Sequence, residues 1–380
     1  MSWQKGIEIA LWFWISSTEG TLCISDLALQ KLATDQFLLY SQAEIRRRLW
    51  ASILEMNLQA SLDSGAPLAL SYDEFDTESP SNVNDCDFDE DAKFLPCHPE
   101  TTTTDSSLQR LLLKNLKLRM EILSKANALE PVLPLAQVRS ITSQLVKACH
   151  DCGTHLPDGI EQGARIFRCN FANLLLRRFL LTLHRPLTGG VHTQHPDAYF
   201  SRRVCIDAAS ALVTPPPNPE FSHLESRGGG MFKHSNVHAS LAVCSELLLD
   251  LEEHGQLQWP SFYRGMLINA LHQALEKAAG RVRQGETNVR LHMKLSVALC
   301  LAKSTETGVD LRERMAQAAK QSLEQSCAAI QSYQSFLSTA SDGGVDAPAE
   351  SIDQEDLCFP VDLDLGSLLD IADFGLDSLF

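Results

Sequence analysis

The stretch AEIRRRLWASILEMNLQASLDSGAPLAL, residues 43–70, sets the expectation for the fold because its apolar residues follow the period of an α-helix. One line of them recurs at a spacing of three or four, at Ile45, Leu49, Ile53, Met56 and Ala60. A second line follows the opposite side, at Trp50, Leu54 and Leu58. A helix that is apolar on both sides is usually buried, and Gly65 and Pro67 are typical of a helix end. We therefore predict a buried core helix over residues 44–63.

The rest of the chain repeats this helical pattern, and no segment shows the two-residue alternation of β-strands bounded by hairpin turns. Helices are predicted over residues 105–127, 160–184, 197–213, 237–253, 261–280, 289–304 and 312–337. Asp105 or Ser106 is placed to cap the first of these, and SRGGG at 226–230 predicts a flexible loop. The expected fold class is all-α, with roughly eight to twelve helices over residues 1–340 and a disordered acidic tail over 341–380.

The charge balance argues against direct nucleic-acid binding by the chain as a whole. Its 380 residues include 32 Lys and Arg against 48 Asp and Glu, a formal net charge of −16. A surface of that sign repels phosphate backbones. The 11 cysteines form no disulfide framework, which is typical of an intracellular, reduced protein. No stretch reaches the length of a membrane span, and the apolar run at residues 7–15 indicates a buried helix or, as an alternative, a weak secretory signal.

Residues 72–104 are acidic and polar, contain DEFDTESPSNVNDCDFDED, and predict a loop. Asp85, Asp87 and Asp89 are spaced by two, and oxygen-rich clusters of this kind bind Mg²⁺ or Ca²⁺. A metal-dependent all-α enzyme is therefore one alternative. A solvated acidic loop is favoured, because the segment lacks the glycine and glutamate of an EF-hand and no second metal motif accompanies it.

Catalytic and cofactor signatures are missing from the sequence, which contains no GxGxxG after a strand, no GxxxxGK[ST], no HExxH and no GxSxG. Cys149 and Cys152, with His150 and His155 nearby, raise the alternative of a zinc site, but such a site usually needs four ligands and no second CxxC exists. We expect two ordinary thiols at a helix end, and a structural role for His184 at the end of another helix. The sequence thus predicts no enzyme and no catalytic, cofactor or metal site.

Residues 341–380 contain no Lys or Arg and alternate acidic residues with Leu, Ile and Phe. Repulsion between the acids predicts disorder and keeps the apolar side chains available. This composition is typical of activation segments, which fold as a short helix against a partner; a docked C-terminal helix and a solubilising tail are the alternatives. The candidate activation residues are Phe359, Leu363, Leu365, Leu368, Leu369, Phe374, Leu376, Leu379 and Phe380.

Several stretches together resemble the fungal-specific regulatory domain, or middle homology region, of the binuclear zinc-cluster transcription factors. The opening stretch resembles its most recognisable block, and residues 72–104 resemble its aspartate- and proline-containing loop. LLLRRFLLTLHRPL and CIDAASALV resemble two later helices, so the clearest resemblance covers residues 43–213. The motif residues are Arg46, Arg47, Arg48, Leu49, Trp50, Gly65, Pro67, Asp76, Pro80, His184, Arg185 and Pro186.

The resemblance implies an all-α regulatory domain of a nuclear regulator of RNA polymerase II transcription, acting on a metabolic or biosynthetic pathway. The resemblance implies that transcriptional co-activators are partners and that the chain forms a homodimer or a heterodimer. It implies no association with a membrane. In the family, DNA is contacted by a six-cysteine module holding two zinc ions, and this sequence contains no such cluster. DNA contact and zinc are therefore expected only through a missing N-terminal module or a partner protein. A non-DNA-binding partner or scaffold derived from that family is the alternative.

Arg46, Arg47 and Arg48 raise the question of whether the opening helix contacts phosphate. Glu44 stands four residues before Arg48, which is a favourable helical ion pair. The basic cluster is one turn long, and apolar residues occupy the side of the helix that DNA contact would need. We predict ion pairs with acidic partners, the Asp-rich loop among them, rather than phosphate contacts.

Overall fold

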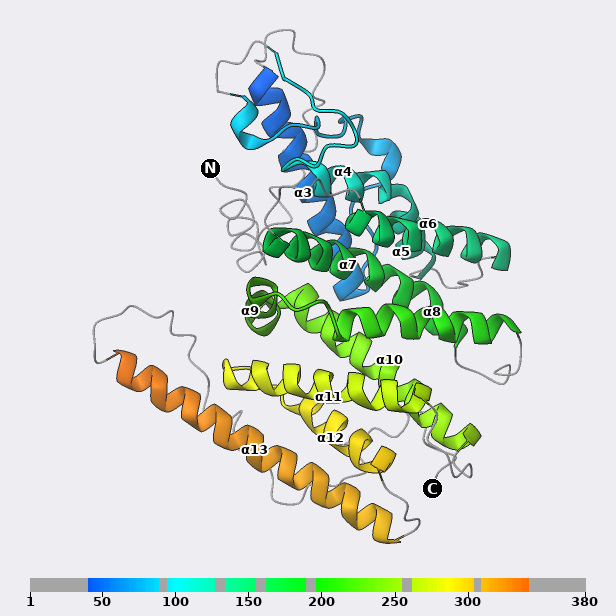
Figure 1. Cartoon of the computed structure of the whole chain (residues 1–380), viewed down its shortest axis with the longest axis vertical. Coiled ribbons are helices and arrows are strands. Elements are labelled where there is room, and N and C mark those ends of the chain that lie inside the picture. Colours follow the sequence, from blue (N-terminus) through cyan, green and yellow to red (C-terminus); the bar gives the residue numbers. More distant parts are fainter. Residues whose placement is uncertain are drawn as a thin grey trace. The chain divides into compact units, whose positions relative to one another are not determined.

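The computed structural model describes residues 40–88, 94–126, 134–154, 162–188, 196–254, 262–303 and 309–341. Over these residues the fold is all-α, with eleven α-helices, three short 3-10 helices and no strand (Figure 1). The predicted fold class is confirmed. The predicted boundary near residue 340 and the disordered tail fall at or beyond the end of the described residues and stay predictions. Among the helices described, none is both long and apolar enough to cross a membrane.

The described residues form two compact units. Unit 1 contains the described residues within Met1–Ala208, Pro215–Ser222 and Gly228–Ser235. Unit 2 contains Ala209–Thr214, His223–Arg227 and the described residues within Asn236–Phe380. Unit 1 holds the helices α3 (Tyr40–Ser64), α4 (Ser107–Lys114), α5 (Leu116–Ala126), α6 (Leu135–Thr154) and α7 (Gln162–His184), and the 3-10 helices η1 (Tyr72–Glu74), η2 (Asp85–Asp87) and η3 (Arg185–Leu187). Both units take residues from α8 (Pro196–Val213), α9 (Pro219–Arg227) and α10 (Gly230–His254). Unit 2 adds α11 (Phe262–Arg283), α12 (Arg290–Lys303) and α13 (Val309–Ser341).

Helix α7 lies at the centre of unit 1, where α4, α5 and α6 pack against it (Figure 1). Its sequence explains this position, because apolar residues occupy most of its circumference and such a helix must be covered on several sides. The buried apolar residues of α7 are Ala172, Leu174, Leu175, Leu176, Phe179, Leu180, Leu181 and Leu183.

Helix α3 buries one apolar line rather than two, so the prediction of a helix buried on both sides was wrong. Trp50, Leu54 and Leu58 are in the core. On the other line, Ile45 is 47% exposed and Leu49 is 56% exposed. The helix packs against α4 and α5, whereas the second line faces solvent over the first turns.

The helix predicted over 105–127 is two helices, α4 and α5, separated at Asn115. The Asn115 side chain donates a hydrogen bond to the Leu111 carbonyl, 2.9 Å away, and an asparagine that bonds its own backbone ends a helix readily. The guanidinium of Arg119 donates to the Leu112 carbonyl at 2.8 Å, which satisfies an acceptor freed by the break. Ser106 precedes α4 as predicted but makes no side-chain cap; its hydroxyl donates instead to the Ser81 carbonyl.

Most of the other predicted helices agree with the structure within a few residues. Helix α9 was missed, because its nine residues are too short to show a clear period. Helix α6 was not among the predicted ranges, and only its end near Cys149 and Cys152 was expected. The flexible loop predicted at 226–230 was too long: α9 ends at Arg227 and α10 begins at Gly230, which leaves two glycines between them. The apolar run at residues 7–15 lies outside the described residues, so its two interpretations stay predictions.

Unit 2 is built on the packing of α11, α12 and α13. One apolar cluster joins α12 to α13 through Met293, Val297, Met315 and Ala319. A second cluster contains Val282, Val289 and Ile330. The last turn of α11 is followed by Gly285, whose φ of +99° suits glycine alone, and a Cβ there would lie 2.6 Å from the Tyr333 ring. Glycine therefore sets how closely this turn approaches α13.

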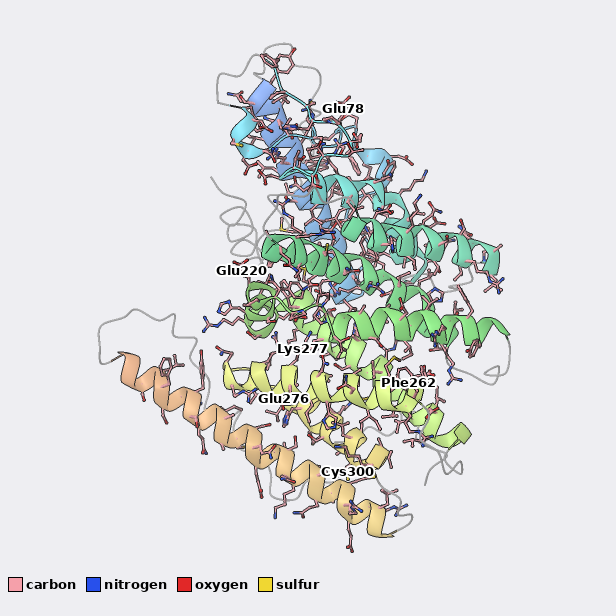
Figure 2. All side chains as sticks on the ribbon, viewed as in Figure 1. Glu78, Glu220, Phe262, Glu276, Lys277 and Cys300 are labelled. Atoms are coloured by element: carbon pink, nitrogen blue, oxygen red, sulfur yellow. The ribbon has the colours of Figure 1, made fainter. Side chains whose placement is uncertain are left out.

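A partly buried ion-pair network holds the short segments of unit 2 on α11. Lys277, labelled in Figure 2, donates to both carboxylate oxygens of Glu225 at 2.9 Å and to the Leu212 carbonyl at 3.2 Å. One turn later, Arg281 donates to the Glu225 carbonyl at 2.6 Å. Leu212 and Glu225 lie in the last turns of α8 and α9, where a cation also meets the negative end of the helix dipole.

We expect Gly285→Ala to destabilise the chain by about 2–3 kcal/mol, because alanine adds both an unfavourable φ and an overlap with Tyr333. Gly65→Ala is the matched control: φ is +66° there but no atom lies within 4 Å of the added Cβ, so the cost is about 1 kcal/mol. Urea unfolding of both variants measures the difference. Equal losses would show that the approach to Tyr333 contributes nothing.

Candidate functional site

Arg48 links α3 to the acidic loop, and both interactions predicted for it are present. Its guanidinium pairs with Glu44 at 3.1 Å and with Asp85 of the loop. It also donates to the Val83 carbonyl at 2.8 Å and lies over the Phe88 ring. Arg47 pairs with Glu44 at 3.1 Å. The prediction of ion pairs is therefore confirmed for these two arginines, and Arg46 is exposed.

Glu44 is the fully buried carboxylate at the centre of this arrangement. It accepts from Arg47, from Arg48 and from the backbone N–H of Ser81, the last at 3.0 Å. A buried carboxylate is tolerated when opposite charge and hydrogen bonds surround it. Glu44 therefore fixes where the loop passes over the first turns of α3.

Asn82 organises the second half of the loop. Its side-chain N–H₂ donates to the carbonyls of Pro99 at 2.8 Å, Thr102 at 3.0 Å and His98 at 3.3 Å. Its side-chain oxygen accepts from the Thr104 hydroxyl at 2.8 Å. The described residues of 71–106 thus form one hydrogen-bonded body, which we call the braced loop. The prediction of a loop is correct for these residues. The loop is held by hydrogen bonds within the protein and is not only surrounded by solvent.

Three carboxylates of the braced loop, those of Asp85, Asp87 and Asp105, are engaged by protein groups. Asp85 pairs with Arg48, and Asp87 accepts from the Asn84 N–H at 2.6 Å and contacts His98 at 2.7 Å. Asp105 accepts from the Asp85 N–H at 3.0 Å and pairs with an arginine of α7. In the described part of the chain, no group of three metal-binding side chains is placed to hold an ion. Asp89 lies outside it.

A polar ladder runs along α3 below the loop, formed by Glu55, Gln59 and Asp63 at a spacing of four residues. Arg119 of α5 donates to both oxygens of Glu55, at 2.7 and 2.8 Å. Arg178 of α7 bonds both Gln59 and Asp63. Burial lowers the pKa of Arg178, and Asp63 opposes that shift. Three helices of unit 1 are therefore matched to one another by buried charge as well as by apolar packing.

His184 ends α7 inside the core, fully buried between two hydroxyl groups. Thr142 of α6 lies 2.8 Å from Nε2, and Ser201 of α8 lies 3.1 Å from Nδ1. Burial lowers the pKa of His184 to about 4, so the ring is neutral at pH 7. A serine beside a histidine is the start of a hydrolytic site, but this pair is sealed from solvent and the other ring nitrogen meets a hydroxyl instead of a carboxylate. The arrangement supports the predicted structural role.

Cys149 and Cys152 lie in the last two turns of α6, at the helix end that the sequence predicts. Burial raises the pKa of the Cys149 thiol to about 11 and that of Cys152 to about 12. Both thiols are therefore protonated at neutral pH in the metal-free chain. His155 lies outside the described residues.

The remaining motif residues are placed around these networks and are not gathered at one point. Trp50 packs edge-on against Phe75 of the braced loop, with ring centroids 5.7 Å apart. Pro80 is buried, and its carbonyl accepts from Arg110 at 2.7 Å. Gly65, with its positive φ, follows the end of α3. Exposed positions are occupied by Leu49, Pro67, Asp76, Arg185 and Pro186. The candidate activation residues of the tail lie outside the described residues.

Several residues that hold the site together were missed. Glu55, Gln59 and Asp63 could have been found, because polar residues at i, i+4 and i+8 mark a stripe on a helix that is otherwise apolar. Their partners could not, since Arg119 and Arg178 lie 64 and 115 residues away from them in the chain. The sequence around Arg177 and Arg178 gave no sign that Arg178 would be buried and that Arg177 would pair with the exposed Asp207.

Comparison with known proteins identifies distant homologues. The chain is 33% identical to transcription factor asR3 of Sarocladium schorii over 304 residues, which cover 70% of this chain and 36% of that protein. It is 33% identical to the aspyridones cluster regulator apdR of Emericella nidulans over 57% of this chain and 32% of the regulator. It is 28% identical to the Zn(2)-C6 fungal-type transcription factor pigI of Monascus ruber over 54% of this chain and 26% of that factor.

These homologues are fungal transcription factors and not enzymes, which confirms the prediction that the chain is not an enzyme. The chain spans about a third of the length of the curated relatives it matches. No family model matches it, and no solved structure matches it. The homology and the all-α fold thus agree with the regulatory-domain resemblance over part of the relatives' length.

Asn82→Ala is expected to destabilise the chain by about 2–3 kcal/mol, because it removes the hydrogen bonds from Asn82 to three partly buried carbonyls and to the Thr104 hydroxyl of the braced loop. Asn57→Ala on α3 is the control, since Asn57 makes none of these bonds, and its effect is expected to stay within about 0.5 kcal/mol. Urea unfolding provides the energies. Amide hydrogen exchange over residues 98–104 should accelerate in Asn82→Ala alone; unchanged exchange there would contradict the role assigned to this asparagine.

Stability is expected to fall with acid because of His184. Its pKa is about 4 in the folded chain against 6.5 for an ordinary histidine, so the unfolded chain binds the proton first as pH drops. The free energy of unfolding therefore decreases below pH 6.5, by at most about 1.4 kcal/mol per pH unit and about 3 kcal/mol by pH 4. His184→Gln should flatten this part of the urea-midpoint profile, whereas the exposed control His150→Gln on α6 should retain it. Parallel profiles for wild type and His184→Gln would disprove the assignment.

Proposed function

We propose that this chain is a transcriptional regulator of the fungal zinc-cluster type, acting in the nucleus on RNA polymerase II transcription. The observation that carries the proposal is the 33% identity to a fungal transcription factor over 70% of the chain. Relatives that include a Zn(2)-C6 fungal-type factor support the same class. The motif residues of the regulatory domain lie in the part of the chain that is all-α in the structure.

The helical units would serve as a regulatory scaffold rather than as a chemical centre. Supporting this, Glu44, Asp85, Glu55 and Asp63 form ion pairs with arginines within unit 1. Such networks fix the relative positions of helices. A domain of this kind can hold attached segments in place while another module contacts DNA.

The acidic tail is the segment proposed to recruit co-activators. Residues 341–380 contain eleven acidic residues and no Lys or Arg, so they carry −11 of the formal net charge of −16. The remaining 340 residues therefore carry a formal net charge of only −5. Concentrated negative charge interleaved with Leu and Phe is the composition that exposes apolar side chains to a partner groove.

DNA contact is proposed to come from a zinc-cluster module outside this sequence or from a partner protein. One relative is a regulator of the aspyridones cluster, which favours biosynthetic genes as the targets of this chain as well. The chain's own charge of −16 makes contact with DNA through its bulk surface unfavourable.

Tethering the chain to a promoter tests the proposal. Residues 345–380 fused to a heterologous DNA-binding domain should raise reporter expression in a fungal host. Replacing Phe359, Leu363, Leu368 and Phe374 by Ala should abolish the signal, because the apolar side chains make the contact. Replacing Ser351, Ser367 and Ser378 by Ala is the matched control and should preserve it. An inactive tail would refute the activation role, and a full-length fusion that neither activates nor represses would refute the regulator proposal.

A further inference from the structure

Three cysteine thiols from two helices gather at one end of unit 1. Cys149 and Cys152 lie on α6, and Cys169 lies on α7, which packs along α6. The Cys169 thiol donates to the backbone carbonyl of Cys152, with sulfur and oxygen 2.9 Å apart. The Cys152 thiol donates to the Ala148 carbonyl at 3.2 Å. The contact between Cys169 and Cys152 brings together residues from opposite sides of the α6–α7 connection.

The three thiols differ in how much of each is open to solvent. Cys149 is buried in the core, whereas Cys152 and Cys169 are both half-buried. Within the described residues the cluster does not meet the geometry of a metal site. Two of the cysteines, which belong to different helices, are therefore partly open to a small oxidant, and the third is shielded.

The geometry allows a bond between these two residues with a small movement. The 2.9 Å contact joins the Cys169 sulfur to the Cys152 carbonyl oxygen, and the bonds on either side of it limit the distance between the two Cα atoms to about 8 Å. A disulfide tolerates a Cα–Cα distance of up to about 7 Å. Cys152 lies two residues before the end of α6 at Thr154, where the last helical turn can shift at little cost. Rotation about χ1 of Cys152 breaks only its bond to Ala148.

We propose that Cys152 and Cys169 form a reversible redox pair that closes to a disulfide when the protein meets a hydroperoxide. This goes beyond the proposed regulatory function and does not depend on it. In a reducing compartment such a bond is transient, which is the form that intracellular disulfides usually take.

The chemistry needs two steps and one oxidant. The Cys169 thiolate attacks the hydroperoxide, the O–O bond breaks, and a sulfenic acid forms while an alcohol or water leaves with the proton. The Cys152 thiol then attacks the sulfenic sulfur, the S–O bond breaks and water is released as the S–S bond forms. The hydroperoxide is reduced by two electrons and the two thiols are oxidised by two.

The order of the two steps follows from the charges near each thiol. Burial raises the pKa of Cys169, and Arg165, one turn earlier on α7, opposes that shift. Among the described residues no cation has this effect on Cys152, whose pKa is raised to about 12 by burial and by its two neighbouring thiols. Cys169 is therefore the thiol that ionises first and attacks the oxidant. Burial of both thiols makes the reaction slow, which suits a response to sustained rather than brief oxidation.

The test is disulfide mapping of the full chain after treatment with hydrogen peroxide, by mass spectrometry of alkylated peptides. The expected result is a peptide pair linked through Cys152 and Cys169 that disappears after dithiothreitol. Oxidation should also raise the urea midpoint of the wild type, because the bond constrains the unfolded chain. Cys152→Ser and Cys169→Ser should each abolish both effects.

Cys86→Ser and Cys97→Ser are the matched controls, since both thiols are exposed and neither lies in α6 or α7. These variants should retain the linked peptide and the shift in midpoint. Oxidation of Cys86 and Cys97 without any Cys152–Cys169 link would overturn the proposal. A link between Cys149 and Cys152 in its place would overturn it as well.

Discussion

The buried carboxylate of Glu44 is the constraint on which the rest of unit 1 depends. It lies on the first turns of α3 with no exposed surface and holds two arginines and the backbone of the braced loop. A buried charge without partners is strongly destabilising, so the loop must pass where it can satisfy this group. Arg48, oriented by Glu44, then reaches Asp85 and the Val83 carbonyl. One ion pair within a helix thus fixes the path of a segment more than thirty residues further along the chain.

The same logic extends down α3 and into unit 2. Glu55 and Asp63 select the arginines of α5 and α7, and Lys277 selects Glu225. Apolar packing alone tolerates sliding of one helix past another, whereas a buried charge has a favourable position only opposite its partner. These pairs therefore specify which helices meet and in which register. A regulatory scaffold needs this property, because attached segments are positioned only as well as the helices that hold them.

Local sequence patterns were enough for the fold class and for most helix positions. The periods of residues 160–184 and 197–213 predicted α7 and α8 to within two residues, because long apolar stripes are unambiguous. Ile45 and Leu49 show the limit of this reasoning. Their spacing is that of a core stripe, yet they face solvent, since the α4–α5 pair covers the other face of α3. Which of two apolar faces becomes buried depends on partners that the local sequence does not name.

The sequence by itself determined that the described part of this protein is all-α, that the described residues of 72–104 form a loop, and that Glu44 and Arg48 pair along one helix face. These features depend on residues within a few turns of one another, where spacing fixes geometry. Only the tertiary structure decided that Arg178 meets Asp63, that Asn82 gathers residues 98–104, and that Cys169 reaches Cys152. Each of these contacts joins residues distant in sequence. Their partners are chosen by the packing of whole helices, because a buried polar group accepts whichever complementary group that packing brings to it.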